Sequence, residues 1–233
     1  MGVREKQMEK KKDWVGNQHS IYVTLGASNH VEEERQPEDF YATSPESAEW
    51  LLKLEPQLDN IYENFVGQGH LAEVFRKAGK LKAISDLVDR GYYPENISTK
   101  YPLDFFKFDK HLKNTDIVSN PPYSEAKLAV EHSLNLVDEG RYVAMFLKTT
   151  FLEGKERKQF FEENPPIRIW VSSSRIPCAK NGEFLIPKKD KDGNVKLDKD
   201  GNPIMEKVSS AVSYSWFIWQ KGYKGDTIVK WFN

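Results

Sequence analysis

The sequence predicts an α/β fold with a mostly parallel central sheet, helices on both faces and an antiparallel hairpin at the C-terminal end. Between about residues 60 and 171, apolar segments of strand composition alternate with segments of helical spacing. Beyond residue 171 this alternation stops, and the chain ends in two adjacent segments of strand composition. The alternation predicts parallel strands joined by helices, and the last two segments predict the hairpin.

Length and composition are typical of one globular domain. The 233 residues are 39% hydrophobic and 30% charged, with a net charge of −1. We predict a charged, flexible tail over residues 1–15 and a single domain over 16–233, with a polar insertion or flap at about 181–207. Because the net charge is near zero, a nucleic acid would have to be bound by a local basic patch.

Cysteine and histidine usage predicts neither an internal disulfide nor a metal site. Cys178 is the single cysteine, and the five histidines are scattered. The polar N-terminus resembles no signal peptide, and no apolar run has membrane length. The sequence therefore predicts a cytoplasmic protein without a membrane partner.

The first helix is predicted to begin at Ser44. Serine is a favoured N-cap residue, Pro45 suits the first helical position, and Pro56 ends the apolar spacing. A segment of strand composition lies earlier, at residues 20–25. Residues 41–43 directly precede the helix and are either one wall of a ligand site or a simple lead-in.

A glycine turn follows the next predicted strand, residues 60–66. Gly67 and Gly69 are separated by one residue and precede a predicted helix at 71–78. Glycines permit close backbone approach, and a helix N-terminus offers N–H donors, so this arrangement predicts a nucleotide-type site. The third glycine of a dinucleotide fingerprint and the Lys-Ser/Thr of a phosphate loop are missing, which disfavours nicotinamide and ATP.

Acidic residues follow this turn at the positions where a nucleoside is bound in many α/β proteins. Asp86 ends a predicted strand at 80–85 and is a candidate for ribose hydroxyls, with Asp89 as the alternative. Asp104 and Phe105 are a candidate pair for an adenine amine and ring. The alternative is a surface acid beside two core phenylalanines, Phe105 and Phe106.

The most informative segment is the strand at 116–118 and the turn after it. Pro121 and Pro122 lack N–H groups and end the strand, which leaves Asn120 at its carboxyl end. The Asn120 side-chain oxygen and the Pro121 carbonyl are two acceptors suited to the two N–H bonds of an aromatic amine, and Tyr123 is suited to stack on its ring. A turn that only ends a strand is the structural alternative.

The remaining chain is predicted to contain two helices and four strands. Ser124 is a candidate cap for the first of these helices. The polar insertion has two Asp-Gly-Asn turns, which predict an exposed hairpin or a DNA-contacting loop; the glycines lie at the wrong positions for calcium loops. The predicted helices are 124–138 and 155–163, and the predicted strands are 142–147, 167–171, 212–219 and 227–232.

On these motifs the chain resembles S-adenosylmethionine-dependent adenine-N6 DNA methyltransferases, especially the short type carried by bacteriophages and prophages. The resemblance covers about residues 16–233. Its strongest motif is Asn120-Pro121-Pro122-Tyr123, which looks like the family's catalytic tetrapeptide. Residues 65–69 look like its cofactor glycine motif, and residues 39–43 like its N-terminal cofactor segment.

The resemblance implies a class I, Rossmann-like methyltransferase fold, S-adenosylmethionine as cofactor and DNA with a flipped adenine as partner. It implies an enzyme without a metal, acting in the cytoplasm of a bacterial host. RNA adenine methylation, protein-glutamine methylation and a non-catalytic phage binding protein are the alternatives. The implied catalytic residues are Asn120, Pro121, Pro122 and Tyr123, and the implied cofactor residues are Tyr41, Thr43, Glu63, Phe65, Gly67, Gly69, Asp86, Asp104 and Phe105.

Two positions differ from the usual pattern of that family. Asn64 stands where many relatives have proline, and Gln68 stands where an acid is frequent between the glycines. No large segment remains for a separate target-recognition domain, so sequence reading would come from loops such as 181–207.

Overall fold

A computed structural model describes residues 41–180, 182, 184–208 and 212–233. The segment expected at 20–25 and the tail at 1–15 lie outside these residues. The α-helices are α2 Pro45–Leu54, α3 His70–Lys77, α4 Ala126–Leu136 and α5 Lys155–Glu163, and the 3₁₀ turns are η1 Phe105–Lys107, η2 Tyr123–Glu125 and η3 Thr149–Leu152. The strands are β1 Tyr41–Thr43, β2 Ile61–Glu63, β3 Leu81–Ser85, β4 Ser98–Lys100, β5 Asp116–Ser119, β6 Tyr142–Lys148, β7 Arg168–Ser172, β8 Cys178–Lys180, β9 Leu185–Pro187, β10 Met205–Lys207, β11 Tyr214–Gln220 and β12 Ile228–Phe232.

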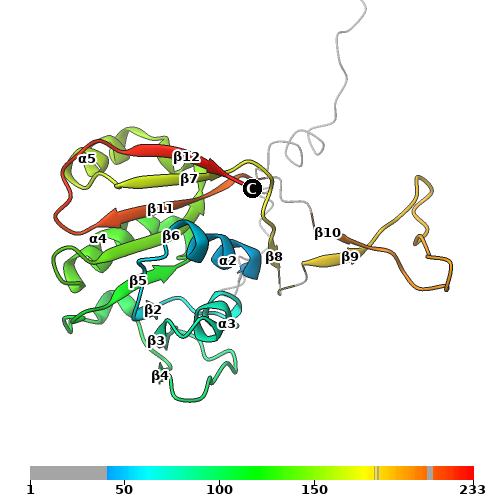
Figure 1. Ribbon diagram of the computed structural model, residues 1–233, viewed down its shortest axis with the longest axis horizontal. Coiled ribbons are helices and arrows are strands. Elements are labelled where there is room, and N and C mark those ends of the chain that lie inside the picture. Colours follow the sequence, from blue (N-terminus) through cyan, green and yellow to red (C-terminus); the bar gives the residue numbers. More distant parts are fainter. Residues whose placement is uncertain (1–40, 181, 183, 209–211) are drawn as a thin grey trace, which may run out of the picture. The chain divides into compact units, whose positions relative to one another are not determined.

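Eight strands form the central sheet in the order β12-β7-β11-β6-β5-β2-β3-β4 (Figure 1). Strand β11 runs antiparallel to both of its neighbours, and the other neighbouring pairs are parallel. This confirms the predicted mostly parallel α/β sheet.

The two C-terminal strands differ in detail from the predicted hairpin. Strands β11 and β12 run in opposite directions, as a hairpin requires, but they are not neighbours. Strand β7 lies between them, antiparallel to β11 and parallel to β12. This pairing buries β11, whose residues from Tyr214 to Trp219 are all buried, in the interior of the sheet.

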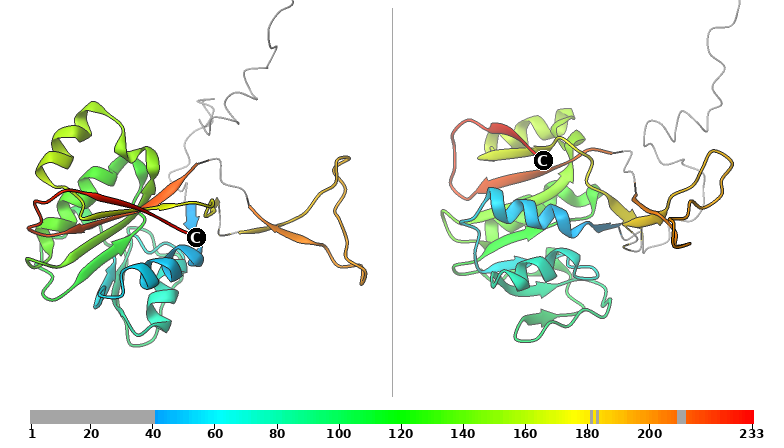
Figure 2. Two further views of the ribbon diagram at one scale, coloured as in Figure 1. Left: turned by 45° about the horizontal axis from the view of Figure 1, so that its top comes forward. Right: turned by 45° about the vertical axis from the view of Figure 1, so that its right-hand side comes forward.

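Helices cover both faces of the sheet, and each face has its own apolar core. Helices α2 and α3 lie on one face and α4 and α5 on the other (Figures 1 and 2). Side chains alternate between the cores along a strand: in β11, Trp216 packs with the α2–α3 side and Phe217 with the α4–α5 side. Both rings are fully buried.

Two short two-stranded ribbons do not pair with the central sheet. Strand β1 pairs antiparallel with β8, and Thr43 lies opposite Cys178. Strand β9 pairs antiparallel with β10 within the insertion. Beyond this pair, the two Asp-Gly-Asn repeats each close a turn: Asp190 Oδ1 accepts from the Asn194 N–H, and Asp198 Oδ1 accepts from the Asn202 N–H, both at 2.9 Å.

The helix at 155–163 has the predicted bounds, and α2 begins at Pro45 with Ser44 as its N-cap residue, as predicted, whereas the predicted cap at Ser124 is wrong. Ser44 occupies the N-cap position of α2, yet its side chain caps nothing; the Ser47 hydroxyl donates instead to the Ser44 carbonyl at 2.8 Å. Ser124 lies inside η2, so α4 begins two residues later, at Ala126. The edge strand β4 has few apolar residues and was not predicted. Within the described ranges, no helix is long and apolar enough to cross a membrane.

Candidate active site

Asn120 lies at the carboxyl end of β5, where the chain turns at the two prolines. Its side-chain Nδ2 donates to Thr43 Oγ1 at 2.7 Å. Its Oδ1 is buried and has no hydrogen-bond partner among the described residues. A buried acceptor without a partner is costly, so this oxygen is a site for an N–H donor from a ligand.

Tyr123 begins η2 and lies among polar groups from other strands. Its hydroxyl donates to the Tyr214 hydroxyl at 3.1 Å, and Lys148 Nζ lies 4.5 Å from the ring centroid. Burial raises the Tyr123 pKa far above its usual value, so the hydroxyl stays protonated at neutral pH. The half-buried ring thus has a cation over one face.

The glycine turn between β2 and α3 is joined to the end of β3. Gly67 and Gly69 both have positive φ, 55° and 83°. The Gly67 N–H donates to Asp86 Oδ2 at 2.8 Å, and the Val66 N–H donates to the Ser85 carbonyl at 3.1 Å. Positive φ favours glycine at both positions, as the motif predicts.

Asp86, and not Asp89, is the acid that contacts this turn. Asp86 lies directly after β3, and its Oδ1 also accepts from the Val88 N–H at 3.0 Å. Asp89 is exposed and accepts from the Gly91 N–H at 2.9 Å and from the Tyr93 hydroxyl. Of the two candidates for ribose hydroxyls, only Asp86 lies beside the glycines.

Glu63 and Asn64 are buried at the carboxyl end of β2, next to β5. Glu63 is 1% exposed and its Oε2 has no partner among the described residues. Burial and the nearby Asp86 raise its pKa well above 4.5, although a hydrogen bond from the Ala72 N–H acts in the opposite direction. Asn64 is 0% exposed, and both polar atoms of its side chain lack described partners. These groups surround a polar site that suits a cationic ligand.

Asp104 and Phe105 lie differently from the prediction. Asp104 caps η1 by accepting from the Phe106 N–H at 3.1 Å, and it pairs with Lys107 at 3.0 Å. Phe105 is only 2% exposed, and its ring packs in the core, 5.4 Å between centroids from Phe65. The accessible ring surface here therefore belongs to the half-buried Phe65 and Phe106.

Sequence reasoning missed three residues beside the turn at residues 120–123. Lys148 ends β6, Tyr214 begins β11, and Cys178 begins β8. Burial raises the pKa of the Cys178 thiol to about 11, while the hydroxyls of Tyr123, Tyr214 and Thr43 lower it through hydrogen bonds. No spacing in the sequence indicates these contacts, because the residues come together only through the pairing of β1 with β8 and of β11 with β6.

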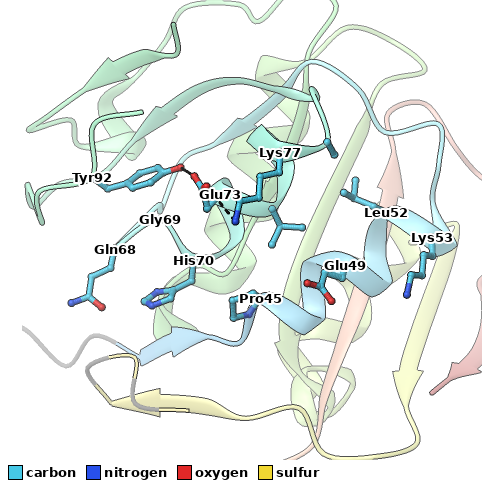
Figure 3. Close-up of a pocket in the computed structure, with 12 residues that line it drawn as sticks. Pro45, Glu49, Leu52, Lys53, Gln68, Gly69, His70, Glu73, Lys77 and Tyr92 are labelled. Carbon is cyan, nitrogen blue, oxygen red and sulfur yellow. Dashed lines mark hydrogen bonds and ion pairs between the residues drawn. The ribbon is translucent and has the colours of Figure 1, made fainter. Parts of the chain in front are cut away.

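A cavity of about 720 Å³ opens between α2 and α3, beside the glycine turn (Figure 3). Gln68, Gly69 and His70 line one end, and Glu49 and Lys53 belong to the other wall. Neither Asn120 nor Asp86 lines this cavity, so it is separate from the turn at residues 120–123. Among the residues described, no group of three or more His, Cys, Asp or Glu side chains could hold a metal ion.

Comparison with known proteins identifies the fold. No protein-family model and no curated protein matches this sequence. A proposed RNA methyltransferase from Pyrococcus horikoshii has a TM-score of 0.51 at 12% identity, covering 88% of this chain and 99% of its own. The modification subunit of a proposed type I restriction enzyme from Vibrio vulnificus has a TM-score of 0.53 at 10% identity, covering 84% of this chain and 48% of its own.

The type IIG restriction endonuclease BpuSI has a TM-score of 0.51 at 14% identity, covering 82% of this chain and 26% of that enzyme. This chain therefore spans about a quarter of the endonuclease and about half of the modification subunit. At these identities the likeness concerns the fold: the chain has the class I methyltransferase fold, with β11 antiparallel between β6 and β7.

Proposed function

We propose that this protein transfers a methyl group from S-adenosylmethionine to the exocyclic N6 amine of adenine in DNA. The observation that carries the proposal is the unpartnered, buried Oδ1 of Asn120 at the carboxyl end of β5. It lies one strand away from the glycine turn, on a fold shared with methyltransferases. The modification subunit of a proposed restriction enzyme and the restriction endonuclease among the structural neighbours support DNA as the substrate class.

The groups around the glycine turn fit the cofactor. S-adenosylmethionine carries a positive charge on its sulfonium and another on its ammonium, and the buried Glu63 offers an unpaired carboxylate oxygen. Asp86 would accept from ribose hydroxyls, and the turn at Gly67 and Gly69 would lie beside the ligand at the N-terminus of α3. Phe65 is the ring that would pack against the adenine of the cofactor.

Other cofactor residues in the proposal have weaker geometric support. Phe105 would act indirectly, by packing behind Phe65, and Asp104 would have to exchange its contact with Lys107 for one with the ligand. Of Tyr41 the structure describes only the backbone, in β1.

The catalytic turn suits attack by an aromatic amine. Such an amine is a poor nucleophile because its lone pair is delocalised into the ring. Asn120 Oδ1 and the Pro121 carbonyl would accept from its two N–H bonds and favour a tetrahedral nitrogen, whose lone pair then attacks the methyl carbon. When bound, the cofactor supplies this electrophilic methyl group, and the electron pair of the broken C–S bond stays on sulfur. The methylated nitrogen then loses one proton to water.

The surroundings of this turn suit a flipped base. The Tyr123 ring would stack on the adenine, and Pro122 would hold that ring beside Asn120. Lys148, at the end of β6, has its Nζ 4.5 Å from the centroid of the Tyr123 ring, and in this proposal its positive charge would contact a DNA phosphate.

The test is transfer of labelled methyl groups to DNA, RNA and protein by wild type, Asn120→Ala and Asn135→Ala. Asn135 is exposed near the C-terminal end of α4, outside the turn, and serves as a matched control. Removing one positioned acceptor should reduce kcat by about 10²–10³-fold in Asn120→Ala and leave Asn135→Ala unchanged. Label found only in RNA or protein would reject DNA as substrate, and equal activity of all three proteins would reject the role of Asn120.

A further inference from the structure

We propose that Thr43 is a positioning residue, which holds the Asn120 amide with its oxygen toward the substrate, and that Cys178 makes this orientation the preferred one. The inference rests on the proposed methyl transfer and adds a device outside the catalytic turn. The family resemblance implies a different role for Thr43, that of a contact to the cofactor.

The first step concerns the amide itself. The oxygen and nitrogen ends of an asparagine side chain are nearly the same size but have opposite hydrogen-bonding roles. In the observed orientation, Asn120 Nδ2 donates to Thr43 Oγ1 at 2.7 Å, and Oδ1 is left without a described partner. The opposite orientation would point two N–H donors at the N–H bonds of the target amine, which cannot accept them.

The second step is that a threonine hydroxyl alone does not select between these orientations, because it can donate as well as accept. Thr43 is 4% exposed, so its hydroxyl has little access to water and forms its hydrogen bonds with neighbouring protein groups. Cys178 lies opposite Thr43 in the β1–β8 ribbon, and the Thr43 hydroxyl is close enough to the Cys178 thiol to lower the pKa of that thiol. When the hydroxyl proton points to the sulfur, Oγ1 can only accept, and it then selects Nδ2 of Asn120.

The third step is that the same sulfur also lies beside the Tyr123 hydroxyl. The Tyr123 hydroxyl donates to the Tyr214 hydroxyl at 3.1 Å, and both hydroxyls are close enough to the Cys178 thiol to lower its pKa. The backbone reinforces the arrangement, since the Ser44 N–H donates to the Pro177 carbonyl at 3.2 Å. The β1–β8 ribbon thus reaches Asn120 through the Thr43 hydroxyl and Tyr123 through the Cys178 thiol.

The kinetic test compares Thr43→Val, which removes the hydroxyl at nearly constant volume, with Thr43→Ser, which keeps it. Thr43→Val should lower kcat by about 10–100-fold with an unchanged cofactor Kd, and Thr43→Ser should stay within a few-fold of wild type. Cys178→Ala should lower kcat by a smaller factor, about 3–10-fold, because the Thr43 hydroxyl can then also donate to Asn120 and favour the opposite amide orientation. Cys178→Ser should restore kcat toward the wild-type value. Thermal melting of each variant shows that the comparison concerns folded protein.

A second test does not depend on activity. In ¹⁵N-labelled protein without ligand, the Asn120 side-chain amide is assigned by its loss in Asn120→Ala. In Thr43→Val this signal should shift and exchange faster with water than in wild type or Thr43→Ser.

The outcomes separate the two proposals. An unchanged kcat and an unchanged amide signal in Thr43→Val would overturn the positioning role. A weakened cofactor Kd at constant kcat would also overturn it and make Thr43 a cofactor residue. Absence of methyl transfer by the wild type would reject the proposed function, while the amide signal would still decide whether Thr43 holds Asn120.

Discussion

Replacing Gly69 by alanine tests the geometry of the glycine turn most directly. Gly69 has a φ of 83°, and a Cβ atom there would overlap the ring of Tyr92, whose hydroxyl donates to Glu73 at 3.0 Å. Gly79, at the other end of α3, has a similar φ of 69°, but a Cβ atom there would meet nothing within 4 Å beyond its own chain neighbours. The pair therefore separates the cost of backbone conformation from the cost of steric overlap.

The expected magnitudes follow from these two terms. A non-glycine residue with positive φ costs about 1 kcal/mol, and this term applies to both Gly69→Ala and Gly79→Ala. Overlap with a packed side chain adds about 1–3 kcal/mol for Gly69→Ala only. We expect the free energy of unfolding to fall by about 2–4 kcal/mol in Gly69→Ala and by about 1 kcal/mol in Gly79→Ala.

Urea unfolding at constant pH measures both values, and titration with S-adenosylmethionine by calorimetry measures the effect on the site. Gly69→Ala should also weaken cofactor binding, because the turn must shift, whereas Gly79→Ala should not. In the double variant Gly69→Ala/Tyr92→Ala the overlap is relieved, so its destabilisation should be smaller than the sum of the single effects. Equal destabilisation by the two glycine variants, or additive effects in the double variant, would refute the steric reasoning.

Two further predictions concern buried acids. Burial and Asp86 raise the folded-state pKa of Glu63 above 4.5, so the Glu63 carboxyl binds its proton more tightly in the folded than in the unfolded protein. The stability of the wild type therefore falls as pH rises from 4.5 toward the folded-state pKa. The variant Glu63→Gln has no carboxyl group to titrate, so it should not lose stability in this way. Urea unfolding should show the variant to be about 1–3 kcal/mol more stable than wild type at pH 7 and of similar stability near pH 4. A stability difference that does not change with pH would contradict titration of Glu63 as its cause. Glu55 is 1% exposed and paired at 2.5 Å with Arg168, whose side chain is 22% exposed. Changing Glu55 to glutamine should cost about 3 kcal/mol, because it removes the buried charge that pairs with this guanidinium. Glu73, whose side chain is 34% exposed, is the control: changing it to glutamine should cost less than about 1 kcal/mol, and equal losses at the two positions would contradict the role of burial.

Local sequence chemistry was enough to predict the class of fold and the two turns of the candidate site. Pro121 and Pro122 cannot continue a strand, and Gly67 and Gly69 favour positive φ. The alternation of strand and helix segments then placed both turns at carboxyl ends of parallel strands, because each strand in such a sheet is followed by a helix that returns the chain. Roles in binding and catalysis remain predictions for the experiments above.

The meeting of particular side chains depends instead on the packing of distant segments. Thr43 contacts Asn120, 77 residues away, because β1 pairs with β8 and not with the central sheet. Cys178 reaches the same turn through that ribbon, and Phe105 is buried although its sequence neighbours are half-exposed. The insertion of β7 between β11 and β12 likewise follows from packing across the sheet. Such contacts depend on register and burial between distant segments, and no local propensity or spacing specifies either one.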